Sequence, residues 1–171
     1  PLIQMKSCEE VYGKRAIVFA SHPRTCTLTF DSSGTYRDAQ VSHAVRLSSS
    51  IPGFFIPERH DGHRIYDGGL LHNFPIEVYP RIRRATDGPD ADDEDFLALY
   101  IGRPSGQQAH EKWWLREVFD IVLARDDTIQ LQTHHSRSLI LDTAPIGTTD
   151  FALDDSEKDL LVTVGREAAL R

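Results

Sequence analysis

The chain has 171 residues, of which 40% are hydrophobic and 26% charged, as in one globular domain or a large part of one. Its formal net charge of -7, without a Lys/Arg block, disfavours a nucleic-acid-binding surface. No apolar run has the length of a transmembrane helix, and no signal-peptide pattern opens the chain. The two cysteines, Cys8 and Cys26, are too few for a disulfide framework. They fit a reducing compartment, so we expect a cytoplasmic protein.

The first third of the chain predicts two strands and a helix. Residues 16–20 form a continuous apolar run, which is typical of a strand buried on both faces. Residues 26–30 alternate between polar and apolar side chains, as a half-buried strand does. Apolar positions over 41–48 predict a helix with Asp38 as its N-cap, and residues 51–53, Ile-Pro-Gly, end it.

The middle of the chain predicts a short strand at residues 64–67 and a helix from Pro75 to about residue 85. Pro80 falls near the first turns of that helix, where a proline is tolerated. Residues 87–95 hold six of the 26 acidic residues. They lack the glycine and glutamate positions of a calcium-binding loop, so we interpret them as a solvated surface loop.

The last part of the chain predicts strands and helices in alternation. Residues 96–101 are the clearest candidate for a buried strand, and residues 109–125 carry the wide apolar face of a packed helix. A strand is expected at residues 138–142, followed by a helix capped near 154–157. Buried strands alternating with helices predict an α/β layer fold with a mainly parallel sheet.

The stretch from residue 48 to residue 75 contains the strongest functional signal. Asp67 ends a short strand and is followed by Gly68 and Gly69, which permit unusual dihedrals and a close approach of another segment. A carboxylate in this position can be directed into a cleft. Asp-Gly is also a common turn dipeptide whose aspartate bonds its own backbone. The residues alone leave both interpretations open.

Two blocks in this region resemble the patatin-like phospholipase family. They are AVRLSSSIPGFF at residues 44–55 and YDGGLLHNFPI at residues 66–76, in the same order and at a compatible spacing. The sequence DFALDDSEKDLLVTVGREAAL at residues 150–170 is similar to the closing part of bacterial members of the family. The resemblance therefore covers the chain from about Lys14 to Arg171.

The resemblance implies a three-layer α/β/α fold and the hydrolysis of acyl esters of lipids. It implies that Asp67 is the acid of a Ser-Asp catalytic dyad and that Gly68 and Gly69 form the active-site turn. Asn73 is a candidate for supporting the same loop. The implied chemistry uses no cofactor, metal or histidine, and the implied partners are an acyl-ester substrate and a membrane surface. The eight histidines are scattered in the sequence without metal-ligand spacing, and we expect His134 and His135 on the surface.

The nucleophile of the family is missing from this chain. No Gly-x-Ser-x-Gly elbow occurs, and the nearest match, GRPSG at residues 102–106, places its serine one position too late. Ser48, Ser49 and Ser50 lack flanking glycines, so we interpret them as helix-capping and packing residues. We therefore expect residues 1–171 to be the C-terminal portion of one patatin-like domain, inactive alone, whose N-terminal half lies in the same or another chain. Two alternatives remain, a non-catalytic binding module of this fold and an unrelated α/β domain with a structural Asp-Gly-Gly turn.

Overall fold

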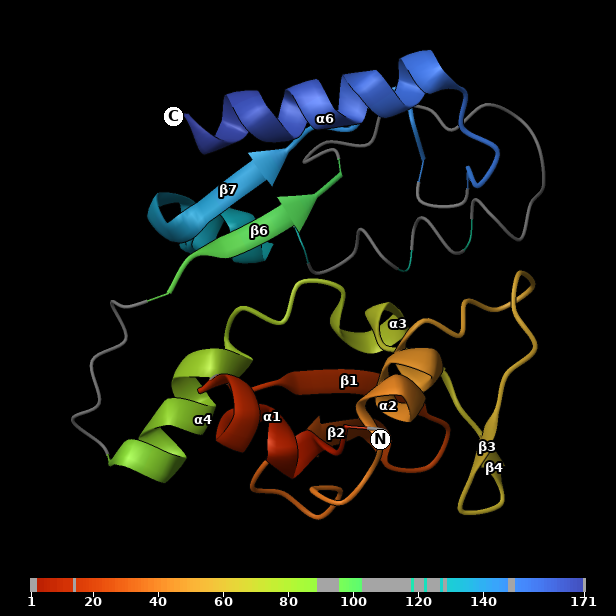
Figure 1. The fold of residues 1–171 in the computed structure, drawn as a ribbon, viewed down its shortest axis with the longest axis vertical. Coiled ribbons are helices and arrows are strands. Elements are labelled where there is room, and N and C mark those ends of the chain that lie inside the picture. The colour runs from red at the N-terminus through yellow and green to blue at the C-terminus, as the bar shows by residue number, and fades with distance from the viewer. Residues whose placement is uncertain are drawn as a thin grey trace. The chain divides into compact units, whose positions relative to one another are not determined.

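The computed structural model describes residues 3–13, 15–88, 96–102, 118, 122, 127, 129–147 and 150–170 (Figure 1). Most of the acidic loop at 87–95, residues 103–106 of the GRPSG segment and nearly all of the helix expected at 109–125 lie outside these residues. The chain divides into two compact units, one containing the described residues up to Asn73 together with residues 118 and 122, and the other containing the rest. Each unit is described by itself.

The first unit is built on a three-stranded antiparallel sheet in the order β2-β1-β5. Strand β1 spans Ile17–His22 and β2 spans Cys26–Asp31, which confirms the two strands expected there. Only three residues connect β1 to β2, too few for the crossover that parallel strands require, so the two form a hairpin. The short strand β5, Tyr66–Asp67, pairs antiparallel with the other edge of β1.

Two helices cover the core of the first unit, α1 (Met5–Tyr12) and α2 (Val41–Ser48). The core residues are largely or completely buried and come from both helices, both long strands and the residue before β5: Met5, Ala20, Leu28, Phe30, Ala44, Leu47 and Ile65. Asp38 is not the N-cap that the sequence predicted. Gln40 holds that position, because its bridge to Gln4 keeps the backbone extended up to the start of α2. The carboxylate of Asp38 pairs with Lys6 instead.

Beyond α2 the chain forms a loop and then a hairpin of two short strands, β3 (Arg59–His60) and β4 (His63–Arg64). The strand predicted over residues 64–67 is therefore divided between β4 and β5. Ile65, which separates them, is completely buried. The helix α3, Gly69–His72, follows β5 directly.

The second unit contains α4 (Val78–Asp87), β6 (Ala98–Ile101), the 3-10 helix η1 (His135–Arg137), β7 (Ser138–Leu141) and α6 (Asp155–Ala169). Strands β6 and β7 pair in parallel, and α6 runs alongside β7 (Figure 1). Tyr100 of β6 forms a buried cluster with Phe74, Ile76 and Leu131, and Ala98 and Ile140 of the two strands pack against it.

In the second unit, one helix starts later than expected, the expected cap of another is present, and one strand is less buried than expected. The helix expected from Pro75 begins at Val78, and Pro80, its third residue, occupies a position where no intrahelical N–H bond is lost. The cap expected at 154–157 is confirmed as a capping box between Asp154 and Glu157. Strand β6 is not buried throughout: only Tyr100 is buried, whereas Leu99 and Ile101 remain more than half exposed.

The mixture of helices and strands confirms the α/β class. Among the described residues the parallel pairing is that of β6 with β7, and the other ladders are antiparallel. The expected predominance of parallel pairing is therefore not seen in this part of the chain, because β1 pairs antiparallel with a neighbour on each of its edges. None of the described helices combines the length and the hydropathy needed to cross a membrane.

Candidate active site

Asp67 is the last residue of β5, and its main chain is held by hydrogen bonds from two neighbouring elements. Its N–H donates to the carbonyl oxygen of Ser50 at 2.9 Å, just after the end of α2. Its own carbonyl oxygen accepts from the hydroxyl of Ser21 on β1 at 2.7 Å. The next N–H, that of Gly68, donates to the carbonyl oxygen of Ser48 at 3.1 Å. The backbone at the candidate acid is thus fixed between β1 and the C-terminal end of α2.

The carboxylate of Asp67 is half-buried, and its two oxygens differ. Oδ1 accepts the N–H of Gly69 at 2.8 Å, which is the local turn bond expected of an Asp-Gly sequence. Oδ2 accepts no hydrogen bond from any described residue. Burial raises the pKa of this carboxyl above its usual value, and the bond from Gly69 offsets part of that effect. Asp67 therefore has one oxygen fixed by its turn and one without a protein partner in the described part of the chain.

Gly68 is required by space rather than by its dihedrals. Its φ and ψ of -63° and -30° are helical and open to any residue. A β-carbon there would lie 2.3 Å from the carbonyl oxygen of Phe19 on β1. The sequence predicted both unusual dihedrals and a close approach, and only the close approach applies at Gly68. The reason is that α3 begins at once, with Gly69 as its first residue.

Asn73 follows α3 at its C-terminal end, with an exposed side chain and helical backbone angles. Its role in supporting the loop around Asp67 remains a prediction.

Two of the three serines at the end of α2, Ser49 and Ser50, behave as the sequence predicted. Ser49 and Ser50 donate their hydroxyls to the carbonyl oxygens of Val45 and Arg46, both at 2.9 Å. Ser50 is completely buried and also accepts a hydrogen bond from Nη1 of Arg46 at 2.8 Å. The sequence did not reveal that the carbonyls of Ser48 and Ser50 hold the Asp-Gly turn. It also missed Ser21, although a hydroxyl residue within the apolar strand β1 was a usable signal.

Four histidines from β1, α2 and the β3–β4 hairpin come together in the first unit. The rings of His22 and His63 are 4.9 Å apart, and His60 lies between Tyr36 at 5.0 Å and His43 at 6.1 Å. Nδ1 of His22 accepts two backbone N–H groups, so it carries no proton. Burial, followed by the nearby His63 and His60, lowers the pKa of His22.

No group of three or more His, Cys, Asp or Glu residues within the described ranges has an arrangement suited to a metal ion. His134, expected on the surface, is half-buried, whereas its neighbour His135 is exposed. Cys8 and Cys26 are free thiols, and Cys26 is exposed on the hairpin between β1 and β2.

Residues 6–79 match the family model described as Patatin-like phospholipase, a span that includes the whole Asp-Gly-Gly turn. The chain is also similar to the protein named "Probable lipid hydrolase 463L" of Invertebrate iridescent virus 6, with 25% identity over 124 residues. That match covers 72% of this chain but only 42% of the viral protein. The matched region thus spans less than half the length of this relative.

Proposed function

The chain belongs to the patatin-like phospholipase family, and from that premise we propose that it supplies the catalytic aspartate of a lipid acyl hydrolase. In this proposal Asp67 is the base of a Ser-Asp dyad, and residues 1–171 are the C-terminal portion of one patatin-like domain. The serine nucleophile and the oxyanion-binding segment come from the N-terminal half, in the same or another chain. The reaction is the hydrolysis of a carboxylic ester of a lipid, without a cofactor, in the reducing cytoplasm.

The observation that carries the proposal is the asymmetric carboxylate of Asp67. A serine hydroxyl is a weak nucleophile unless a base lies within hydrogen-bond reach. The bond from Gly69 N–H holds Oδ1 in place, so Oδ2 remains to accept the proton of an incoming hydroxyl. Because burial raises its pKa, this carboxylate is a stronger base than an ordinary aspartate.

The proposed reaction proceeds in two proton-transfer cycles. Oδ2 of Asp67 takes the serine proton while the serine oxygen attacks the ester carbonyl carbon. The protonated Asp67 then gives that proton to the leaving alcohol, which departs as the acyl-serine forms. Water attacks the acyl-serine with its proton taken by Asp67, and return of that proton to the serine oxygen releases the fatty acid. General-base catalysis of this kind contributes roughly two to four orders of magnitude in rate.

The proposal is tested by Asp67→Asn in the complete protein, with kcat/KM on a lipid ester as the measurement. We expect a loss of about 10²-fold or more, because Asn preserves the turn but cannot take a proton. Asp61→Asn is the matched control: Asp61 also precedes a glycine in a tight turn of the same unit, and its side chain is 77% exposed. Circular dichroism of both variants checks that each remains folded.

The double change of Asp67→Asn with alanine at the nucleophilic serine extends this test. Because a nucleophile and its base act as one unit, the double variant should lose little more than the worse single variant. Near-parental turnover of a folded Asp67→Asn protein would show that Asp67 is only a turn residue, which its bond to Gly69 would then explain.

The 171-residue chain by itself should show no esterase activity, because a base without a nucleophile cannot begin acyl transfer. The assay uses a short-chain chromogenic ester with the purified chain. Turnover that survives repurification and disappears in Asp67→Asn would contradict the proposed division of the site. A complete protein that lacks any Gly-x-Ser-x-Gly elbow would instead favour a non-catalytic binding module of this fold.

A further inference from the structure

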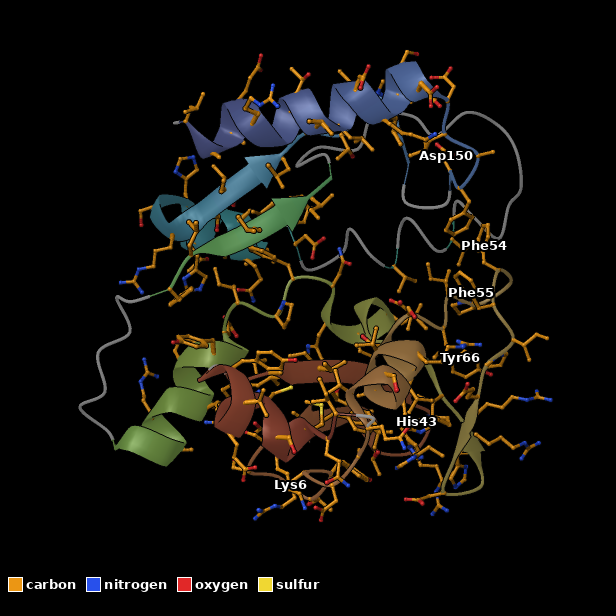
Figure 2. The ribbon with its side chains drawn as sticks, viewed as in Figure 1. Lys6, His43, Phe54, Phe55, Tyr66 and Asp150 are labelled. Carbon is orange, nitrogen blue, oxygen red and sulfur yellow. The ribbon has the colours of Figure 1, made fainter. Side chains whose placement is uncertain are left out.

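The loop that connects α2 to β3 carries three consecutive exposed apolar side chains. Phe54 and Phe55 are 44% and 41% exposed, and Ile56 is 85% exposed. Figure 2 labels both phenylalanines on this loop, with Tyr66 of β5 on the same side of the first unit. Single exposed apolar residues are common on protein surfaces, but a continuous run of large ones marks an interaction surface.

The backbone of this loop is held by hydrogen bonds in a defined conformation. The N–H groups of Phe54 and Phe55 donate to the carbonyl oxygen of Ile51 at 3.2 and 3.0 Å. Nη2 of Arg46 donates to the carbonyl oxygen of Ile56 at 2.7 Å, and the same guanidinium lies 5.9 Å from the centre of the Phe55 ring. The loop is thus hydrogen-bonded at its base and at its tip.

The hairpin that follows the loop carries two arginines on its strands and the exposed Asp61 at its turn. His60 and His63 face one another across the ladder and pack inward, so the alternating residues Arg59 and Arg64 face outward as a cross-strand pair. Both arginines are exposed, and neither has a carboxylate partner among the described residues. Like charges directly opposite each other destabilise a ladder. An anionic partner would relieve this repulsion.

The same loop is connected to the candidate acid at both of its ends. At its start, the carbonyl of Ser50 accepts the N–H of Asp67, and at its end the carbonyl of Glu58 accepts the N–H of Ile65 at 2.9 Å. A partner that holds the loop would therefore also fix the orientation of the turn that carries Asp67.

We propose that residues 54–56 insert into the interfacial layer of an anionic phospholipid bilayer, with Arg59 and Arg64 contacting its headgroups. Large apolar side chains flanked by arginine are the combination that binds such an interface. This inference rests on the proposed function and adds to it the surface at which the lipid ester is met.

Vesicle sedimentation of the complete protein tests the inference, with vesicles of phosphatidylcholine alone and of phosphatidylcholine mixed with phosphatidylglycerol. We expect binding to the mixed vesicles that weakens as salt is added. Ile56→Ser should weaken that binding about tenfold, since it removes most of an apolar side chain that would leave water. Replacing both Arg59 and Arg64 by Gln should weaken binding to the anionic vesicles about fivefold per arginine. Binding to pure phosphatidylcholine should change little.

Val162→Ser is the matched control, because Val162 is an apolar residue of α6 with 58% of its surface exposed. Its affinity for vesicles should equal that of the parent protein. Ile56→Trp gives a direct readout: the indole should be quenched by brominated lipids beyond the level found for the parent, which contains Trp113 and Trp114. A parent protein that fails to bind the anionic vesicles, or an Ile56→Ser variant that binds as the parent does, would overturn the inference. The first of these results would point to a protein partner on this loop.

Failure of this inference can be told apart from failure of the proposed function. Ile56→Ser should leave the hydrolysis of a soluble short-chain ester unchanged, whereas Asp67→Asn should abolish hydrolysis and still bind vesicles. Vesicle binding without any ester turnover would refute the proposed hydrolase activity and support the proposed membrane-binding loop. Turnover of the soluble ester without vesicle binding would support the hydrolase activity and refute the membrane-binding loop.

Discussion

The carbonyl oxygen of Phe19 lies 2.3 Å from the point where a β-carbon on Gly68 would be. The contact exists because β5 ends beside β1, so the first residue after Asp67 passes directly over the β1 backbone. The obstructing atom belongs to the backbone of β1, so no side-chain rotation can move it away. Pairing of β5 with β1 also fixes the backbone just before Gly68, so a small local shift cannot make room for a methyl group.

Gly68→Ala should therefore destabilise the protein by about 1–3 kcal/mol, the usual range for overpacking of a closely packed site. The measurement is the free energy of unfolding from urea denaturation. Gly165→Ala is the control: Gly165 lies in α6, where an added β-carbon meets no atom within 4 Å. That change should stabilise the protein by about 0.5–1 kcal/mol, because glycine is a poor helix former. Equal effects of both variants would show that the contact with Phe19 does not limit position 68.

The features that the sequence predicted well have local causes. A continuous apolar run identified β1, and the spacing of Asp154 and Glu157 identified the capping box of α6. The Asp-Gly-Gly turn was placed correctly at the end of a strand.

The features that the sequence missed depend on contacts between distant segments. Pairing of β5 with β1 joins Ala20 to Asp67 and Ser21 to Tyr66, which are 47 and 45 positions apart, and the bond from Ser21 to Asp67 spans 46 positions. The bridge from Gln4 to Gln40 likewise moved the start of α2 away from Asp38. Such pairing leaves no local pattern, so the surroundings of the candidate acid could be found only in three dimensions.

The ion pair between Arg15 and Asp31 gives a second prediction. Nε and Nη2 of Arg15 donate to the two carboxylate oxygens of Asp31 at 2.8 and 2.6 Å, and the side chain of Asp31 is only 10% exposed. Asp31→Asn should cost about 1–2 kcal/mol in the free energy of unfolding, since Arg15 lies partly in solvent. Asp38→Asn, at the exposed pair with Lys6, is the control and should have nearly no effect.

The same pair predicts acid sensitivity. The hydrogen bonds and charge of Arg15 lower the pKa of Asp31 below 3.8 in the folded state. Its stabilising contribution is therefore present above the unfolded pKa of 3.8 and is lost as the pH falls through the lower, folded value. In an acid titration monitored by circular dichroism, the Asp31→Asn variant should not show the loss of stability that protonation of Asp31 causes in the parent. An unchanged acid transition would contradict the role of the pair.

His22 predicts a stability change at milder pH. Its pKa in the folded state is lowered from 6.5, so the unfolded chain takes up the proton first as the pH falls. The contribution of neutral His22 is present above pH 6.5 and declines below it. His22→Asn keeps an acceptor for the N–H groups of Arg24 and Thr25 but cannot titrate. The measurement is Tm against pH. As the pH falls from neutral to below the folded-state pKa of His22, the Tm of the variant should decrease less than that of the parent. A parallel decline in both proteins would assign the effect to the neighbouring histidines.

Asp67 predicts opposite effects of one substitution on stability and activity. Burial raises the pKa of its carboxyl above 3.8 in the folded state, so between 3.8 and that higher value the folded protein binds more protons than the unfolded chain. The free energy of unfolding contributed by Asp67 therefore falls as the pH rises through this window, and the penalty is complete above the folded-state pKa. Asp67→Asn removes the buried charge and keeps an acceptor for Gly69 N–H.

At neutral pH the complete protein with Asp67→Asn should therefore have a higher Tm than its parent. The difference should shrink as the parent carboxyl becomes protonated in acid. In the proposed mechanism only the ionised carboxylate accepts the serine proton, so the parent protein should likewise lose kcat/KM as the pH falls through the raised pKa of Asp67. Thermal unfolding and turnover of a soluble ester, both followed against pH, provide the two measurements. A lower Tm at neutral pH together with retained activity would contradict both the buried charge and its use as a base.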